Sequence, residues 1–409
     1  MNRQKFLYLT GLFGSSVLLG IGTHGWAAKA INNSNNNHKR LVVIFLRGAV
    51  DGLNVVVPHE ETAYYDARSS IAIPPPGEAS GCLNLDDQFG LHPALNSLMP
   101  LWKQGSLAFV HACGSSVQTR SHFDAQEYME NGTPGIKKTS DGWMNRLLGF
   151  MSPTTPVRAL NLGQTTPRIL TGKMPIATIA LSRGIARPLP IDLPETGAAF
   201  DQLYTGNDSL SKVYQSGRRA RQQLLVDLQQ EMIQANNGAP LPTGFAPDAQ
   251  KLAQIMVKDA DVRLAFLALG GWDTHVNQGS STGNLARNLK SLGDGLSALV
   301  KGLGALYSDT AIVVMSEFGR TVRENGNGGT DHGHGNVMWV LGGGIKGGKV
   351  YGEWPGLSES ELFEKRDLAV TTDFREVMSN ILQSHLQLNT DKISRVFPNY
   401  EPSNKIQLL

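Results

Sequence analysis

The chain has 409 residues, and its 37 basic and 35 acidic residues leave a formal net charge of only +2. This balance, without a long basic run interleaved with aromatic residues, excludes nucleic acid as an expected partner. The length exceeds that of a typical domain, but α/β folds often hold such a length as one unit, so we expect one large domain.

The first 30 residues are typical of a signal peptide. Arg3 and Lys5 form a basic segment, residues 7–21 (LYLTGLFGSSVLLGI) form an apolar segment, and residues 28–30 form an A-x-A cleavage site. The apolar segment is shorter than the roughly 20 residues that a membrane-spanning helix needs, which favours cleavage over anchoring. We therefore expect an exported protein, periplasmic or extracellular, with no stable membrane span after cleavage.

The export route stays open between the general secretory and the twin-arginine pathways. The sequence NRQKFL resembles a twin-arginine signal but has Gln4 where that pattern has its second arginine. Residues 31–39 then follow as a polar spacer that is expected to be disordered. The only cysteines are Cys82 and Cys113, for which we expect two buried thiols, with a disulfide as the alternative.

Strand-like and helix-like segments alternate along most of the remaining chain. Short apolar runs rich in β-branched residues predict strands at residues 41–48, 106–114, 262–271, 310–319 and 336–344. Apolar residues at helical spacing predict helices at residues 121–131, 285–307 and 373–386, the last with Asp373 as its N-cap. Because the strand runs are apolar throughout, both faces must be covered. The pattern predicts an α/β fold with a mostly parallel central sheet and helices on both faces.

The middle of the chain departs from this alternation. Residues from about 151 to 250 are rich in Pro, Thr and Gly, and they contain one polar helical segment at 210–236. No strand of the main pattern is expected there. We interpret this segment as an insertion or cap within a domain that spans residues 40–409.

Polar residues follow each of the first four predicted strands. They are Arg47 and Asp51, then Thr119 to His122, then Asp273 and His275, then Glu317 and Arg320. Parallel strands place their carboxyl ends at one edge of a sheet, where ligands of α/β proteins bind, so these residues are expected to converge. Asp331, His332 and His334 precede the fifth strand, and their loop lies at the same edge or at the opposite one.

Five motifs in this order resemble the family of domain of unknown function 1501, which is itself similar to the alkaline phosphatase and sulfatase superfamily. The motifs are FLRGAVDGLNVVVPH, TRSHFDAQEYMENG, GGWDTH, SEFGRT and GTDHGHGN, and the resemblance covers nearly all of the chain after the signal. It implies an alkaline phosphatase-like sheet that holds two divalent metals and a nucleophile at its carboxyl edge.

The resemblance also implies roles for particular residues. The expected metal ligands are Asp51, Asp273, His275, Glu317, Asp331, His332 and His334. Ser121 takes the place of the nucleophile, with Thr119 as the alternative, although a serine that opens a helix is also explained as an N-cap. Arg120 or Arg320 would bind the non-bridging oxygens of an anionic ester. The chain departs from the pattern at Phe318, because the pattern often has an Asp-His pair where this chain has Glu317 and Phe318.

Carboxylates and imidazoles in this mixture suit zinc, manganese, calcium or magnesium. The leading hypothesis is an exported metal-dependent hydrolase that acts on phosphate or sulfate esters, with a small anionic ester or a glycan as substrate. Two alternatives remain: a non-catalytic binding or assembly protein with a degraded site, and a phosphoryl or sulfuryl transferase or mutase. The oligomeric state is left open.

The signal peptide leads to a first prediction. The mature chain is expected to begin near residue 29 or 31, because the basic, apolar and small-residue segments occur in the order that signal peptidase requires. N-terminal sequencing of the exported protein checks this. An intact Met1 on protein recovered from the cytoplasm would contradict the interpretation of these residues as a cleaved signal.

Overall fold

The computed structural model of the chain describes residues 39–137, 139–151, 159–163, 165–179, 205–206, 208, 211–212, 233–259, 261–403 and 405–409. The predicted signal peptide, and the predicted spacer up to residue 38, lie outside the described residues. No helix within the described ranges is long and apolar enough to cross a membrane.

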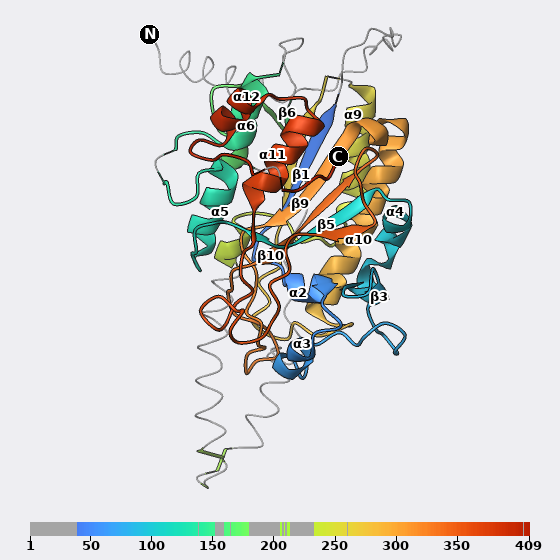
Figure 1. Cartoon of the computed structure of the whole chain (residues 1–409), viewed down its shortest axis with the longest axis vertical. Helices are drawn as coiled ribbons and strands as arrows, with labels where there is room; N and C mark the ends of the chain where they lie inside the picture. The colour runs from blue at the N-terminus through green and yellow to red at the C-terminus, as the bar shows by residue number, and fades with distance from the viewer. Residues whose placement is uncertain are drawn as a thin grey trace, which may run out of the picture. The chain divides into compact units, whose positions relative to one another are not determined.

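A nine-stranded sheet forms the centre of the unit that runs from His38 to Leu409 (Figure 1). Its strand order is β11-β5-β10-β9-β1-β8-β6-β7, and β12 pairs with β5. The strands are β1 (Arg40–Leu46), β5 (Leu107–Gly114), β6 (Ala159–Leu162), β7 (Ala177–Ile179), β8 (Leu264–Leu269), β9 (Thr310–Ser316), β10 (Asn336–Gly342), β11 (Lys349–Tyr351) and β12 (Thr372–Asp373). The five strands predicted from the sequence are all present. Every pairing is parallel except the two that β10 makes, which confirms the mostly parallel sheet.

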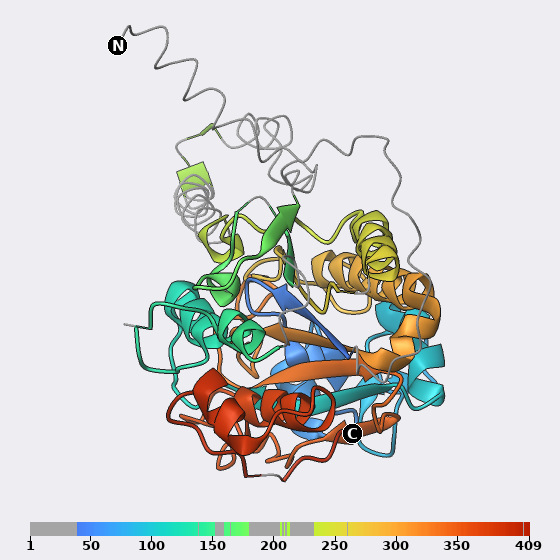
Figure 2. The ribbon, with the colours of Figure 1, turned by 90° about the horizontal axis from the view of Figure 1, so that it is seen from above.

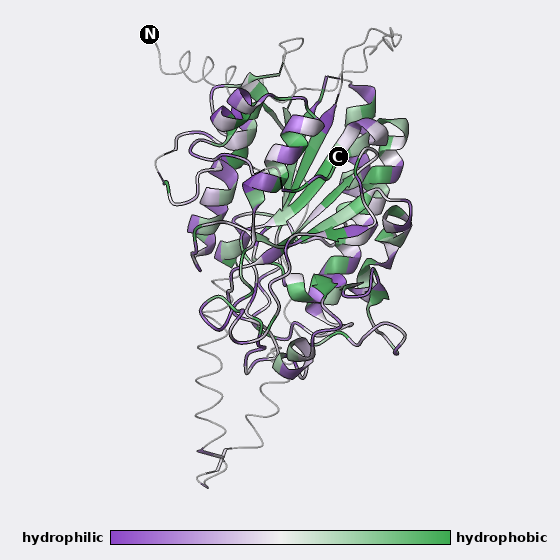
Figure 3. Ribbon diagram, viewed as in Figure 1, coloured by the Kyte–Doolittle hydropathy of each residue, from purple (hydrophilic) through white to green (hydrophobic). Residues whose placement is uncertain are grey.

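Helices cover both faces of this sheet (Figure 2). One face packs on α9 (Phe245–Lys258), α10 (Asn284–Leu303), η1 (Pro93–Leu98) and α4 (Met99–Lys103), and the other on α5 (His122–Asn131), α6 (Trp143–Gly149), α11 (Phe374–Ser384) and α12 (Thr390–Val396). Strand β1 contributes side chains to the hydrophobic core on each face of the sheet: Val42 and Ile44 pack on the α9 and α10 side, and Val43 and Phe45 pack on the α6 and α11 side. The sheet is accordingly hydrophobic over its length (Figure 3), as continuous apolar strands require.

Smaller elements were not predicted from the sequence. They follow β1 as α2 (Gly52–Val55), β2 (Val56–Val57), α3 (Thr62–Ala67), β3 (Leu83–Asn84) and β4 (Gly90–Leu91), with η2 (Arg168–Leu170) and η4 (Gly304–Asp309) elsewhere. The three short strands form a separate antiparallel sheet, and at two residues each they are too short to show a period-two pattern. Cys82 and Cys113 are both free and buried, which confirms the expectation of two thiols.

The segment from about 151 to 250 contributes two strands to the central sheet. Strand β6 pairs with β8, and β7 pairs with β6, both in parallel. The expectation that this segment holds no strand of the main pattern was therefore wrong. These strands have four and three residues, so they lack the length on which strand prediction depends. Most of the predicted polar helix at 210–236 lies outside the described residues, and the role of the segment as an insertion or cap stays a prediction.

The direction of β10 decides where the loop before it lies. Strand β10 runs antiparallel to both of its neighbours, β9 and β5. Its first residue is therefore at the edge where β5 and β9 end, so the loop that carries residues 331–334 reaches the carboxyl edge of the sheet. At the other end of the chain, Asp373 caps α11 by accepting a hydrogen bond from the Arg375 N–H at 2.9 Å, as predicted.

Two buried histidines are held in their neutral form. The Nε2 atom of His92 lies 3.1 Å from the Ser280 carbonyl, and that of His111 lies 2.9 Å from the Val56 carbonyl. In each ring Nδ1 accepts a hydrogen bond from a backbone N–H, so no site is left for a second proton. Burial lowers the pKa of each to about 4, despite the favourable carbonyl contact.

These two side chains predict a loss of stability in acid. Between the usual histidine pKa of about 6.5 and the lowered value of about 4, these histidines are protonated in the unfolded chain but not in the folded chain. The free energy of unfolding therefore falls as the pH drops through this range. Each histidine is expected to contribute about 2 kcal/mol of loss between pH 7 and pH 5. Urea unfolding of wild type and His92→Asn at both pH values checks this, since asparagine keeps the cap of η1 but does not titrate. Parallel pH curves for the two proteins would contradict it.

Candidate metal centre

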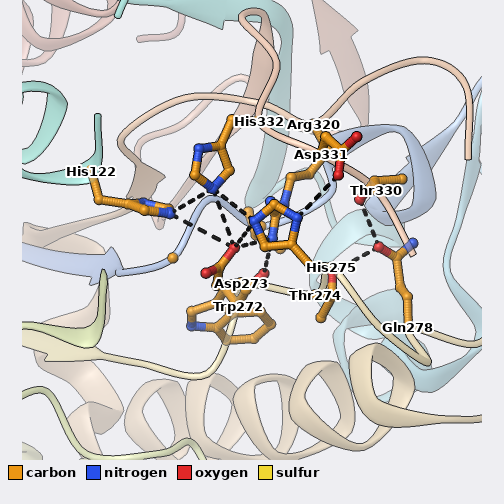
Figure 4. A network of polar contacts seen from close by, with 12 residues as sticks. His122, Trp272, Asp273, Thr274, His275, Gln278, Arg320, Thr330, Asp331 and His332 are labelled. Carbon is orange, nitrogen blue, oxygen red and sulfur yellow. Dashed lines mark hydrogen bonds and ion pairs between the residues drawn. The ribbon is translucent and has the colours of Figure 1, made fainter. Parts of the chain in front are cut away.

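Four side chains meet at the carboxyl edge of the sheet (Figure 4). His122 is the first residue of α5, which follows β5, while Asp273 and His275 lie in the segment that follows β8. His332 lies in the loop between β9 and β10. All four are buried, with exposed fractions of 9% or less. The predicted convergence of residues that are distant in the sequence is thus present for His122, Asp273 and His275, and His332 joins them from the loop whose edge the sequence left open.

The nitrogen atoms of the three imidazoles point towards one another. The His332 Nε2 atom lies 2.9 Å from the His122 Nε2 atom and 2.9 Å from the His275 Nε2 atom. The Asp273 Oδ1 atom lies 3.1 Å from His275, 3.5 Å from His332 and 3.7 Å from His122, measured to Nε2 in each case. One carboxylate oxygen and three ring nitrogens therefore share a small buried volume.

The opposite nitrogen of each ring is fixed by an oxygen atom. His122 Nδ1 lies 2.8 Å from Glu317 Oε1, His275 Nδ1 lies 3.2 Å from Asp331 Oδ1, and His332 Nδ1 lies 2.8 Å from the Arg120 carbonyl. Carboxylate and carbonyl oxygens can only accept hydrogen bonds, so each Nδ1 carries the hydrogen. In the neutral rings every Nε2 then presents a lone pair to the others. This is the arrangement in which histidine ligands are oriented by outer carboxylates and carbonyls.

Two arrangements satisfy these nitrogens: protons on His122 and His275, whose pKa values are raised, can be donated towards His332, or a metal ion can accept an electron pair from each ring. The Asp273 Oδ2 atom is also buried and has no hydrogen-bond partner among the residues that the structure describes, so it can serve as a further donor to a metal. The ligand atoms of His122, Asp273 and His332 lie within 4.8 Å of one another, and these three residues can hold a metal ion. The donor set of imidazoles and one carboxylate fits a divalent metal.

Burial and the neighbouring charges shift the pKa values of these groups in different directions. Burial lowers the pKa of His122, but Asp273 and Glu317 outweigh it and raise the value to about 9. Burial raises the pKa of Asp273, but Arg320 and the three histidines hold it well below its usual value. Burial lowers the pKa of His332, with Arg320 and His122 acting in the same direction. The site thus favours an ionised Asp273 with positive charge close to it.

Arg320 supplies part of that positive charge. Its side chain is fully buried, and its Nη2 atom donates to Asp273 Oδ1 at 2.6 Å. Its Nε and Nη1 atoms are buried and have no hydrogen-bond partner in the part of the chain that the structure describes. Because a buried donor normally has an acceptor, these two groups are candidates for binding an anion beside the histidines.

Glu317 and Asp331 lie behind the histidines. Both Glu317 oxygens are engaged: Oε1 accepts from the Gly48 N–H and from Gln126 and contacts His122, and Oε2 accepts from Ser316. Asp331 is half exposed and contacts Nδ1 of His275, and Asn325 donates to the same carboxylate oxygen. The sequence placed both residues among the ligands, whereas the structure places each against the outer nitrogen of a histidine.

Asp51 and His334 do not join the cluster. Asp51 is fully buried, and Arg68 binds both of its oxygens at 2.6 and 3.1 Å while Gln278 donates to Oδ2 at 2.6 Å. The Nε2 atom of His334 lies 3.2 Å from the Ser115 carbonyl, and its ring packs 4.7 Å from that of Phe363. Asp51, which was expected to bind a metal, is thus paired with Arg68, a residue that lies outside the five motifs.

The residues just before α5 face outwards. Ser121 is exposed and caps α5, since its Oγ atom accepts from the Asp124 N–H at 3.4 Å. Thr119 Oγ1 accepts from the Ser121 N–H at 3.2 Å. The Arg120 guanidinium pairs with Glu364 at 2.7 Å and with Asp367 at 3.0 Å, so its backbone carbonyl, rather than its side chain, contacts the centre.

His122 is the residue that the sequence comparison missed. The resemblance assigns a role to Ser121 at this helix start and none to His122. A signal was nevertheless present, because a histidine at the first position of a helix after a strand lies at the ligand-binding edge of an α/β sheet. Its partner Glu317 directly follows the buried strand β9, which is separated from β5 by β10 alone, so the two side chains reach each other at the same edge of the sheet.

Glycines allow the loop before β10 to close on the centre. A Cβ atom on Gly333 would lie 2.5 Å from the Arg320 carbonyl, and one on Gly329 would lie 2.3 Å from the Thr274 carbonyl. The close approach is fixed by backbone hydrogen bonds from Gly333 to Gly319 at 2.8 Å and from Thr330 to Thr274 at 3.1 Å. The glycine-rich motif thereby holds His332 over the segment that follows β8.

A pocket of about 640 Å³ adjoins the centre through Asp331. Its lining combines apolar residues with the charged residues Asp66, Arg323, Glu324, Lys365 and Arg366. Arg366 donates to the His332 carbonyl at 2.9 Å, so the wall of the pocket contacts the loop that carries a candidate ligand. The pocket offers donors and acceptors of both charges to a polar molecule.

Fold and centre together define an α/β protein with a histidine-rich candidate metal site at the carboxyl edge of its sheet. Residues 38–397 match the model of the family described as "Protein of unknown function (DUF1501)", and the chain belongs to this family. This confirms the resemblance that its motifs showed. No curated protein matches the chain.

Several solved structures are similar to this chain. The crystal structure of Ps i-CgsB in complex with k-i-k-neocarrahexaose is 10% identical with a TM-score of 0.40, covering 90% of this chain and 75% of that one. A protein in the alkaline phosphatase superfamily from Vibrio parahaemolyticus is 12% identical with a TM-score of 0.38, at 86% and 72% coverage. The C-terminal periplasmic domain of EcEptC from Escherichia coli, in complex with Zn, is 10% identical with a TM-score of 0.40, at 89% and 88% coverage.

The geometry predicts which histidines metal binding requires. His122→Ala and His332→Ala are expected to weaken binding of zinc or manganese by more than the roughly 10- to 100-fold that loss of an outer-shell partner causes. His334→Ala is the matched control and is expected to bind as wild type does, since its ring lies outside the cluster. Elemental analysis and metal titration of the three folded variants measure this. Equal metal content in His122→Ala and wild type would contradict the assignment.

Proposed function

We propose that the chain is an exported, metal-dependent hydrolase of phosphate or sulfate esters. One observation carries the proposal: three imidazole nitrogens, each with its ring fixed from behind by an oxygen, face one another beside a buried carboxylate. Packing alone does not account for this cluster, because hydrophobic side chains of the same volume would stabilise the fold at least as well.

His122, Asp273 and His332 would hold the metal, with His275 beside them. When bound, a divalent metal supplies positive charge to the oxygens of an anionic ester and lowers the pKa of the attacking group. Other residues of the chain orient the ligands and would bind the ester. Glu317, Asp331 and the Arg120 carbonyl keep the rings in the ligand orientation. Arg320 offers its unpartnered Nε and Nη1 donors to non-bridging oxygens of the ester.

Ser121 is the proposed nucleophile, with Thr119 or a water molecule as the alternatives. Its hydroxyl is exposed and stands at the N-terminus of α5, directly before the candidate ligand His122. The helix N-terminus favours negative charge and would stabilise the alkoxide that attacks phosphorus or sulfur. The same hydroxyl also caps the helix, so the experiment must separate the two roles.

The proposed substrate is a small anionic ester or a glycan that carries one. The pocket of about 640 Å³ beside Asp331 is large enough for a sugar-sized group, and its mixed charged lining suits hydroxyls better than apolar groups. A second sugar hydroxyl in place of water would turn the same chemistry into transfer. Export belongs to this proposal because the N-terminal segment has the order of a signal peptide.

One observation favours a non-catalytic alternative. Arg320 already places a guanidinium 2.6 Å from Asp273 Oδ1, so the carboxylate has a cationic partner without any metal. A binding or assembly protein that keeps the fold with a degraded site would show this arrangement and would purify without metal. A protein that binds about one or two equivalents of a divalent metal and cleaves an ester would rule it out.

The role of Ser121 can be tested with three substitutions once a screen of phosphate monoesters, diesters and sulfate esters with each metal has given a substrate. Ser121→Ala removes both the hydroxyl and the cap, Ser121→Asp keeps a cap without the nucleophile, and Ser121→Thr keeps both. If Ser121 attacks the ester, Ala and Asp variants are expected to lose turnover by at least about a thousandfold while Thr retains part of it.

Stability gives the control. Loss of the cap in Ser121→Ala is expected to lower the free energy of unfolding by roughly 0.5–2 kcal/mol, and Ser121→Asp is expected to restore it. Turnover and melting temperature are measured on the same samples. Near-normal turnover in a folded Ser121→Asp protein would remove Ser121 as nucleophile and leave Thr119 or water.

A further inference from the structure

A second cavity of about 370 Å³ lies beside strand β11, lined by none of the residues of the candidate metal centre. Its walls come from the loop before β4, from His111 on β5, and from the end of β11 and the segment after it. The residues that give it chemical character are Asp86, Asp87, Phe89, His111, Tyr351 and Trp354.

Aromatic rings form the wall and are held in place. The Phe89 ring lies 5.2 Å from that of Trp354 and 5.4 Å from that of His111, and the His111 and Trp354 rings are 4.7 Å apart. The indole N–H of Trp354 donates to Glu61 Oε1 at 2.7 Å, which fixes the orientation of the ring. Gly352 lets this segment approach β5, because a Cβ atom there would lie 2.5 Å from the His111 carbonyl.

The charge of the lining is negative. No lysine or arginine lines the cavity, while Asp86 and Asp87 both do. One oxygen of Asp86 accepts from the N–H groups of Gln88 and Phe89, and Asp87 has no hydrogen bond or ion pair with any residue that the structure describes. Just outside the lining, the Lys349 ammonium lies 4.9 Å from the centre of the Tyr351 ring, so Lys349 occupies that ring and adds one positive charge beside the cavity.

We propose that this cavity binds a small organic cation, a primary or quaternary ammonium group. Aromatic faces attract a cation through their quadrupole, and the attraction is stronger where the site excludes water. The two carboxylates repel an anion, and a neutral apolar ligand would desolvate them without compensation. A volume of about 370 Å³ admits a group of the size of choline. The site is independent of the hydrolase proposed above.

Calorimetric titration of the full chain with three probes tests the site. Choline and putrescine carry ammonium groups, and 3,3-dimethylbutan-1-ol has the shape of choline without its charge. We expect at least one of the two cations to bind at millimolar concentration or tighter, with affinity that falls as salt rises, and the neutral alcohol to bind at least roughly tenfold more weakly. Equal binding of choline and the alcohol, or binding of neither cation, would overturn the proposal.

Substitutions locate the binding in this cavity. Asp87→Asn and Trp354→Ala are each expected to weaken binding by roughly tenfold, while Trp354→Phe retains most of it because an aromatic face remains. Asp294→Asn on α10 is the matched control, since Asp294 is an acidic residue outside the cavity that pairs with Lys290. Circular dichroism confirms that each variant is folded. Wild-type affinity in both Asp87→Asn and Trp354→Ala would reject the site, whatever the outcome for the metal centre.

Discussion

The carboxylate of Asp273 is buried, and its negative charge must be compensated inside the protein. Arg320 donates to Oδ1 at 2.6 Å, and three imidazoles approach the same oxygen. An isolated buried charge is among the most costly features that a fold can hold, so the surrounding elements are arranged to neutralise it. The start of α5, the segment after β8 and the loop before β10 each bring one or more polar groups to this point. The groups of the candidate centre therefore compensate the buried charge of Asp273, whether or not they also bind a metal.

Other buried carboxylates at this edge are compensated in different ways. Asp51 is bound through both oxygens by Arg68, which also donates to two backbone carbonyls and to Asn54. Glu317 is surrounded by neutral donors and by His122. In the first arrangement Arg68 and Gln278 occupy the carboxylate, whereas in the second the carboxylate contacts an imidazole whose Nε2 atom faces His332. This difference explains why carboxylates of similar position in the sequence have different relations to the centre.

The sequence predicted the five long strands, three of the helices and part of the site, but not the 14-residue helix α9, and the reasons differ. Both faces are buried in strands β1, β5, β8, β9 and β10. Each of these strands therefore appears in the sequence as a continuous apolar run, which is typical of a strand covered on both sides. Short edge strands such as β7 carry too few residues to show a pattern. The positions of His122, Asp273 and His275 followed from strand ends in a parallel sheet, whereas that of His332 depended on the direction of β10, which the sequence did not show. Arg68 could not be found this way, because it lies after α3 and reaches Asp51 only through tertiary packing.

The reversed direction of β10 has a consequence for how the protein folds. This strand inserts between β5 and β9, segments that are about 200 residues apart in the sequence, and the loop before it carries His332. Pairings of such long range form late, because the entropy of closing the loops is lost before the contacts stabilise the chain. His122 follows β5 and His332 precedes β10, so these two imidazoles meet only when the long-range pairing of β5 with β10 has formed, and a bound cation would stabilise that pairing.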